Sequence, residues 1–403
     1  MAIISSKEQI KRSIEAASRG RQTAIFTPGG QLVVVNIFTP ETIESLMPQL
    51  NITGTHPAFL VNGKKVSALL VGTFACALSN NEGVSQAMTP IAPANYFNAA
   101  NAINAMGDKW HMMNIHEYSF FQMKSIKLGM RPMGNTADVF DKMFGWDFAD
   151  HTAYGQRVDG KAPGTVLDES TNGNANKMTT IYTGSGPASF RHDRTYNGVS
   201  DLVGNGYMLL PGLRFVGKPD TGYEVQILGS DIGMMANMTG DPLNLTYNGN
   251  GDWKAIDAST GNLVSPTYTG SLVTGNYLPT TNNAIKMYPS AKVSNETLGK
   301  TGYHLPLLDN NGGHRLGDGL VWRSGLNAAA IARLRQVGAL PHAEVSVAGN
   351  VFAGNNETVS MYPTAAANCL ILLSPPSGLY GMVFTTNLYM DRPQRLRVCS
   401  YFE

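Results

Sequence analysis

Residues 108–135 read DKWHMMNIHEYSFFQMKSIKLGMRPMGN, and they predict a helix whose two ends are both marked in the sequence. Asn114 stands three residues before Glu117, which is the spacing of a capping box, and Gly129 follows Leu128 as a C-terminal cap. Between these ends the apolar residues recur every three or four positions. The stretch therefore predicts a helix with one face in the core.

The same stretch contains His116-Glu117, which is the first half of a zinc-protease signature. Such a helix needs a second histidine one turn later, but Phe120 stands at that position. We therefore predict that His116 lies on the exposed side of the helix and that Glu117 serves the helix cap rather than a metal.

Turn residues and caps predict further elements on both sides of this helix. Pro28-Gly29-Gly30 and Asn62-Gly63 are typical of hairpin turns, while Asn95 and Asn327 are suitable N-caps. Residues 155–319 read as short strands, turns and polar loops. The predicted elements are an amphipathic helix at 6–18, a hairpin of 23–27 and 31–38, a second hairpin of 57–61 and 67–74, and helices at 95–107 and 327–337.

Composition restricts the classes of function. The chain has 403 residues, of which 43% are hydrophobic and only 15% charged, and 30 Lys+Arg balance 29 Asp+Glu to a net charge of +1. No basic run indicates nucleic-acid binding. The apolar stretches are far shorter than the roughly 20 residues that cross a bilayer. We expect a soluble protein with no conventional export signal, no nucleic-acid partner and no membrane insertion.

No combination of reactive residues predicts catalysis. Cys76, Cys369 and Cys399 are odd in number and widely spaced, so we predict buried thiols rather than a disulfide framework or a zinc site. The cluster at 191–194, Arg-His-Asp-Arg, could supply a general base, but no nucleophile can be assigned to it. A structural or solvated cluster is the favoured interpretation.

The opening stretch is one of several motif-like segments that follow one another along the chain. They are HPAFLVNG at 56–63, WHMMNIHEY at 110–118, RPMGNT at 131–136, RVDGKAPG at 157–164, GSGPASFRHD at 184–193, NGVSDLVGN at 197–205 and DWKAID at 252–257. In this order they resemble phage proteins with a C-type lectin fold of the formylglycine-generating-enzyme type. The sequence RVC at 397–399 is more distantly similar to the end of the phage major tropism determinant.

The resemblance implies an α+β fold with a C-type-lectin-like domain at residues 56–403, preceded by an N-terminal attachment or oligomerisation region at 1–55. Two departures limit what else it implies. Many relatives have a carboxylate in the segment that reads GNGYML here at 204–209, so we expect no bound calcium and no other cofactor. Cys369 and Cys399 do not match the close cysteine pair that holds copper in the enzymes, so no enzymatic activity is expected.

The function that the resemblance implies is host attachment. We expect a non-enzymatic virion protein, made in the host cytoplasm and carried at a phage tail-fibre or spike tip, that binds a glycan or protein receptor through residues 344–403. Its partners would be the receptor, other tail proteins and two further copies in a homotrimer, with the helix at 6–18 as a candidate contact. The candidate receptor-binding residues are Tyr380, Phe384, Asn387, Tyr389, Arg392 and Arg395.

Two alternatives stay open at this point. Tyr380 and Phe384 could instead be core residues of the closing strands, and any of the six could be buried or serve a structural role. The chain could also be a structural tail or capsid-decorating protein whose loops make subunit contacts. A lectin-fold enzyme is the third interpretation, and it is disfavoured because no catalytic set assembles in the sequence.

Overall fold

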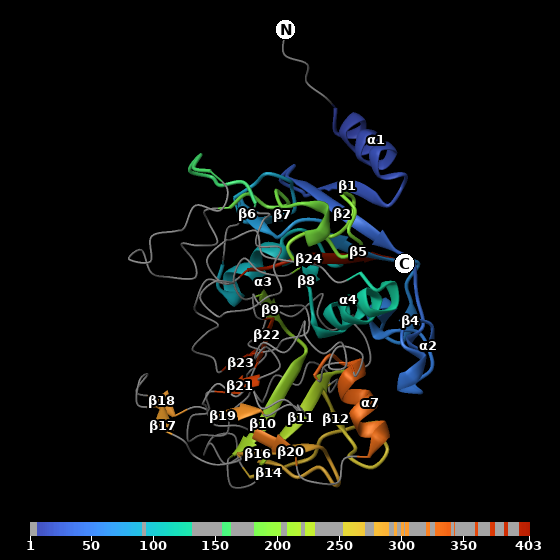
Figure 1. Cartoon of the computed structure of the whole chain (residues 1–403), viewed down its shortest axis with the longest axis vertical. Helices are drawn as coiled ribbons and strands as arrows, with labels where there is room; N and C mark the ends of the chain where they lie inside the picture. The colour runs from blue at the N-terminus through green and yellow to red at the C-terminus, as the bar shows by residue number, and fades with distance from the viewer. Residues whose placement is uncertain are drawn as a thin grey trace.

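The computed structural model contains helices and several antiparallel sheets, so the fold is α+β (Figure 1). It describes residues 6–90, 94–130, 155–162, 181–202, 208–218, 222–229, 253–270, 278–289, 294–295, 300–301, 303–305, 320–322, 327–339, 342, 359–361, 371–374, 383–385 and 395–403. Among these residues, no helix is both long enough and apolar enough to cross a membrane.

The N-terminal helix and hairpin form as the sequence predicts. Helix α1 (Lys7–Ser18) begins at Ser6, whose side chain makes a capping box with Gln9. Strands β1 (Gln22–Phe26) and β2 (Leu32–Phe38) pair in an antiparallel hairpin. Helix α1 lies at one end of the molecule and packs on β1 (Figure 1).

This hairpin belongs to a five-stranded sheet that joins the two ends of the chain. The strand order is β1-β2-β5-β24-β8, with β5 at Ala68–Gly72, β24 at Val398–Phe402 and β8 at His111–Met112. The predicted boundary between residues 55 and 56 therefore falls between strands of one sheet, and the hairpin is not a separate unit.

Two helices cover opposite faces of this sheet, because successive strand residues point to opposite sides. Leu70 and Val398 face a core that includes Ala99 and Ile103 of α3 (Tyr96–Asn104). Leu69, Val71 and Cys399 face a larger core that includes buried residues of α4 (Ile115–Leu128). Helix α4, which the opening stretch predicts, thus packs beneath the sheet in the view of Figure 1.

A second sheet lies beyond α4 and shares the larger core. It has the order β13-β12-β11-β16-β20, with β10 paired to β11, and α7 packs nearby (Figure 1). These elements are β10 (Leu213–Lys218), β11 (Gly222–Leu228), β12 (Trp253–Ile256), β13 (Leu263–Val264), β16 (Lys286–Pro289), β20 (Leu320–Trp322) and α7 (Ala328–Gln336).

Shorter elements make up the rest of the described secondary structure. They are α2 (Ile43–Leu46), η1 (Pro48–Leu50), η2 (Pro57–Phe59), β3 (Leu60–Val61), β4 (Lys64–Lys65), β6 (Ala77–Ser79), β7 (Glu82–Val84), η3 (Ala188–Phe190), β9 (Met208–Leu210), β14 (Tyr268–Thr269), β15 (Leu278–Pro279), β17 (Ser294–Asn295), β18 (Lys300–Thr301), β19 (Tyr303–Leu305), β21 (Val359–Met361), β22 (Ile371–Ser374) and β23 (Val383–Thr385).

The predicted helix caps are confirmed, whereas two other local predictions are wrong. Asn95, Asn114 and Asn327 all accept hydrogen bonds from backbone N–H groups at their helix starts. The second hairpin is shorter than predicted, since β3 pairs only with β4 while β5 pairs with β2 and β24. His116 is 1% exposed rather than on a solvated face, because the second sheet covers that side of α4.

We predict that Asn114→Ala destabilises the fold by about 2 kcal/mol, because it leaves the N–H groups of His116 and Glu117 buried without their acceptor. Asn95→Ala is the matched control, since its cap is exposed, and it should cost about 0.5–1 kcal/mol. Urea denaturation of both variants measures the difference. Equal losses would show that burial adds nothing to the Asn114 cap.

Candidate functional site

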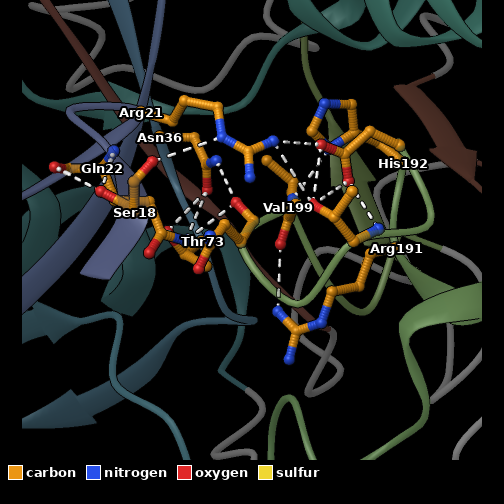
Figure 2. Close-up of polar contacts among 12 residues, drawn as sticks. Ser18, Arg21, Gln22, Asn36, Thr73, Arg191, His192 and Val199 are labelled. Atoms are coloured by element: carbon orange, nitrogen blue, oxygen red, sulfur yellow. Dashed lines mark hydrogen bonds and ion pairs between the residues drawn. The ribbon is translucent and has the colours of Figure 1, made fainter. Parts of the chain in front are cut away.

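The loop at residues 191–202 is held against the five-stranded sheet by buried polar side chains (Figure 2). Asn36 of β2 donates through Nδ2 to the carbonyl oxygen of Asn197 at 2.7 Å, and Gln22 of β1 donates to the same oxygen at 3.0 Å. Thr73 donates to Asn36 Oδ1 at 2.7 Å. The amides in the hairpin thus fix the loop backbone, which explains why they are tolerated in a buried position.

Arg191 stabilises the conformation of this loop through hydrogen bonds to backbone carbonyl groups. Its guanidinium donates to the carbonyl oxygens of Gly198 at 3.0 Å and Gly184 at 2.9 Å, and it lies 5.6 Å from the ring centroid of Phe74. Gly184 has φ +65°, and a Cβ there would meet Phe74 at 2.5 Å. The close approach of the two segments therefore requires glycine at this position.

His192 is a buried neutral imidazole. Its Nδ1 accepts a hydrogen bond from the Val199 N–H at 2.8 Å, so the proton of the neutral ring is on Nε2. Burial lowers the pKa of His192 to about 4; nearby Asp193 opposes this shift, and Lys124 and Arg21 add to it. The ring is uncharged at neutral pH and can donate from Nε2.

A pocket of about 420 Å³ opens beside this ring, between the end of β2, the C-terminal half of α4 and residues 192–195. Arg21 and Asp193 form one wall, with Arg21 Nη1 3.1 Å from Asp193 Oδ2. Asp193 also accepts from the backbone N–H and the hydroxyl of Thr195. This wall is therefore a fixed, hydrogen-bonded ion pair.

The opposite wall carries a second ionic group. Glu41 pairs with Lys124, and its other oxygen lies 3.0 Å from Lys127 Nζ. Burial alone would raise the pKa of Glu41, but the hydrogen bonds from the two lysines hold it below its ordinary value. Phe38 and Leu128 complete the lining with apolar surface. A concave site with apolar walls and a few placed polar groups is the usual form of a small-molecule site.

His116 and Glu117, the His-Glu pair of the opening stretch, have structural roles and do not line this pocket. Glu117 accepts from the Asn114 N–H at 2.9 Å, which confirms its predicted role in the cap, and its other oxygen lies 2.7 Å from His111 Nε2. Burial would lower the pKa of His111, but Glu117 raises it above the ordinary value. His116 Nε2 contacts the Leu228 carbonyl oxygen at 3.0 Å and so ties α4 to the second sheet.

The C-terminal arginines are also internal. Arg397 donates to the carbonyl oxygens of Gly72 at 2.6 Å and of Ser200, so it links β5 to the 191–202 loop. Arg395 is fully buried, and burial lowers its pKa to about 10. The prediction that Arg395 contacts a receptor is therefore wrong. Its side chain points into the protein, where Nη2 donates to the Leu202 carbonyl oxygen at 3.4 Å.

The other predicted receptor residues are not brought together by the described part of the chain. Phe384 lies in β23, of which the structure describes only the backbone. Tyr380, Asn387, Tyr389 and Arg392 lie outside the described residues, as does Cys369. Cys76 and Cys399 are buried and free, as predicted, and burial raises the pKa of both thiols.

The described side chains form no metal-binding group. Within the described ranges, no three His, Cys, Asp or Glu side chains gather where they could hold a metal ion. The pocket residues Arg21, Glu41 and Lys124 come from three distant segments, and no local sequence pattern indicated that they would meet. His192 and Asp193 were visible as a cluster in the sequence, and the structure assigns them to the pocket wall.

Comparison with models of known protein families and with curated proteins identifies no match to this chain.

We predict that fold stability falls as the pH drops from about 6.5 toward 4, because the unfolded chain binds a proton on His192 that the buried neutral imidazole of the folded state does not bind. The pKa of His192 is lower in the folded state, so its contribution is complete above pH 6.5 and is lost as the pH falls through about 4. His56 and His342, with pKa values of about 3, act in the same direction.

His192→Asn tests this assignment, because the Asn carbonyl can accept from the Val199 N–H without titrating. Between pH 6.5 and 4, the folding equilibrium constant of the wild type should fall by about tenfold more per pH unit than that of the variant. Urea denaturation at pH 7, 6 and 5 supplies the slopes. Identical slopes would exclude His192 as one of the titrating groups.

Proposed function

We propose that this chain is a non-enzymatic phage virion protein, carried at a tail-fibre or spike tip, that binds a host surface receptor. The observation that most supports this proposal is that residues of the motif segments have structural roles in the core. His111 and Glu117 come from one motif, and His192 and Arg397 come from two others. Each is buried in contacts that join helices, strands and loops. Such side chains build a rigid frame, and a rigid frame that carries variable loops suits a receptor-binding protein.

The fold that we propose is C-type-lectin-like, of the formylglycine-generating-enzyme type. Two features support it beyond the α+β class. The C-terminal strand β24 lies between β5 and β8, so the end of the chain closes the sheet that its first hairpin begins. The segments at 110–118, 184–193 and 197–202, which carry the resemblance, all contact this sheet or the helix beneath it.

The receptor face would lie in residues 344–394, before the buried end of the chain. Because Arg395 and β24 are internal, the candidates that remain are Tyr380, Phe384, Asn387, Tyr389 and Arg392. Aromatic and arginine side chains contribute most to protein interfaces, and they are the first residues to test.

The alternative is a structural tail or capsid-decorating protein, and helix α1 favours it. Ile10 and Ile14 of α1 are only partly buried, and the helix projects from the body of the molecule (Figure 1). An amphipathic helix in this position could bind a neighbouring subunit, including two copies of the chain itself in a homotrimer. Light scattering that finds a stable monomer would contradict the trimer.

We expect purified protein to bind host cells, and Tyr389→Ala combined with Arg392→Ala to weaken that binding by about 30-fold, as the loss of interface hot spots does. A matched control removes the same residue types from exposed positions elsewhere, with Tyr196→Ala and Arg12→Ala. Flow cytometry with labelled protein gives the affinities. Absence of binding by the wild type, together with tight incorporation into particles, would instead establish the structural role.

A further inference from the structure

The pocket beside His192 and the surface next to it together carry more positive charge than their carboxylates neutralise. Arg21 is paired with Asp193, whereas Lys124 and Lys127 share the single carboxylate of Glu41. Among the lining residues, Arg21 and Lys124 balance Asp193 and Glu41, and Lys127, which does not line the pocket, adds one positive charge next to Glu41. At a concave site the dielectric is lower than in bulk water, so this additional charge acts more strongly than it would on an open surface.

Hydrogen-bond donors also remain available at this pocket. Arg21 uses Nη1 for Asp193 and Thr195 and Nε for the Ser18 carbonyl oxygen. Within the described part of the chain its Nη2 makes no hydrogen bond, and Figure 2 shows that terminal nitrogen without a partner. His192 has its proton on Nε2, and the described residues supply no acceptor for it. The pocket therefore suits a ligand rich in acceptor oxygens.

An apolar surface completes the pocket. The Phe38 ring is held edge-to-face by Phe120, Phe121 and His192 at centroid distances of 5.5, 5.3 and 5.4 Å. Leu128 and Met130 line the same pocket and are 40% and 38% exposed. A ligand that covers these side chains would remove apolar surface from water, which favours binding.

We propose that this pocket binds a hydroxyl-rich ligand with one carboxylate, of the size of a single acidic sugar unit such as a uronic acid. The carboxylate takes hydrogen bonds from Arg21 Nη2 and Lys124, a ring oxygen or hydroxyl accepts from His192 Nε2, and the C–H face of the sugar packs on Phe38 and Leu128. The volume of about 420 Å³ is within the range of small-ligand pockets.

This inference adds a second binding site, apart from the receptor face proposed in residues 344–394, and it rests on the proposed function for the source of the ligand, which would be an acidic polysaccharide on the host surface. The chemistry of the pocket does not depend on that source. Free uronic acid and a polymer of the same sugar carry the same recognition group, so binding of each can be measured separately.

Glucuronate and glucose are matched probes, because they differ only in the carboxylate. In calorimetry with the full chain at pH 7, we expect glucuronate to bind at least about tenfold more tightly than glucose, since hydrogen bonds to charged groups are the stronger kind. Equal affinities, or no glucuronate binding at millimolar concentration, would overturn the proposal.

Lys124 and Lys127 provide a matched pair of variants, since both bind Glu41 but only Lys124 lines the pocket. Lys124→Met keeps most of the apolar side chain and should weaken glucuronate binding by about tenfold. Lys127→Met should weaken it by no more than about threefold, because its charge acts from a distance through solvent. Equal losses in the two variants would show that the carboxylate is not bound in the pocket. Thermal unfolding verifies that both variants fold.

The imidazole of His192 reports binding at the site itself. A carboxylate beside the ring stabilises its charged form, so NMR titration should find a higher His192 pKa with glucuronate than with glucose. An unchanged pKa would contradict binding beside this ring, even if calorimetry detects an interaction.

Binding of polyglucuronic acid distinguishes a surface polysaccharide from a soluble sugar as the source of the ligand. If the polymer binds through the same pocket, Lys124→Met weakens its binding as it does for the free sugar, which supports a surface polysaccharide. If only the free sugar binds, the pocket holds a soluble ligand and the link to host attachment fails. Failure of the proposed function itself is distinct: the chain would not bind cells, while glucuronate would still bind the wild type more tightly than Lys124→Met.

Discussion

The guanidinium of Arg397 lies where three parts of the chain meet. It stands beside the C-terminal strand β24, it donates to the Gly72 carbonyl oxygen at the end of β5, and it donates to the Ser200 carbonyl oxygen in the 191–202 loop. A buried guanidinium is costly unless its donors are satisfied, and breaking one partner leaves an uncompensated charge. The strand, the sheet and the loop are therefore held in one arrangement, and the pocket wall formed by residues 192–195 depends on that arrangement.

A second buried contact fixes the helix beneath the sheet. Glu117 closes the N-terminus of α4 and also pairs with His111, which lies in the edge strand β8. The helix cannot rotate about its axis without losing the contact with His111. This matters for the pocket because Lys124 and Leu128 lie farther along the same helix, and their positions follow from that of its first turn.

Polar groups in this protein thus serve two different purposes. His111, Glu117 and Arg397 from the motif segments are buried and paired, and they give the fold a single geometry. Arg21 and Lys124 at the pocket are partly exposed, and Arg21 keeps a donor that the described part of the protein does not use. An unsatisfied donor costs little next to water but about 1–3 kcal/mol in the interior, so a partly exposed group keeps a free donor at lower cost.

Local sequence determined the secondary structure near Asn95, Asn114 and Asn327, because a cap acts within one helical turn and needs no distant partner. It also determined the first hairpin through its Pro-Gly-Gly turn, and it predicted buried thiols at Cys76 and Cys399. Only the tertiary structure decided that β5 pairs with the C-terminal strand, that His116 and Arg395 are internal, and that Arg21, Glu41 and Lys124 surround one pocket. The physical reason is range: these outcomes depend on which surfaces meet across long separations in the chain, and residue type and local spacing carry no information about that.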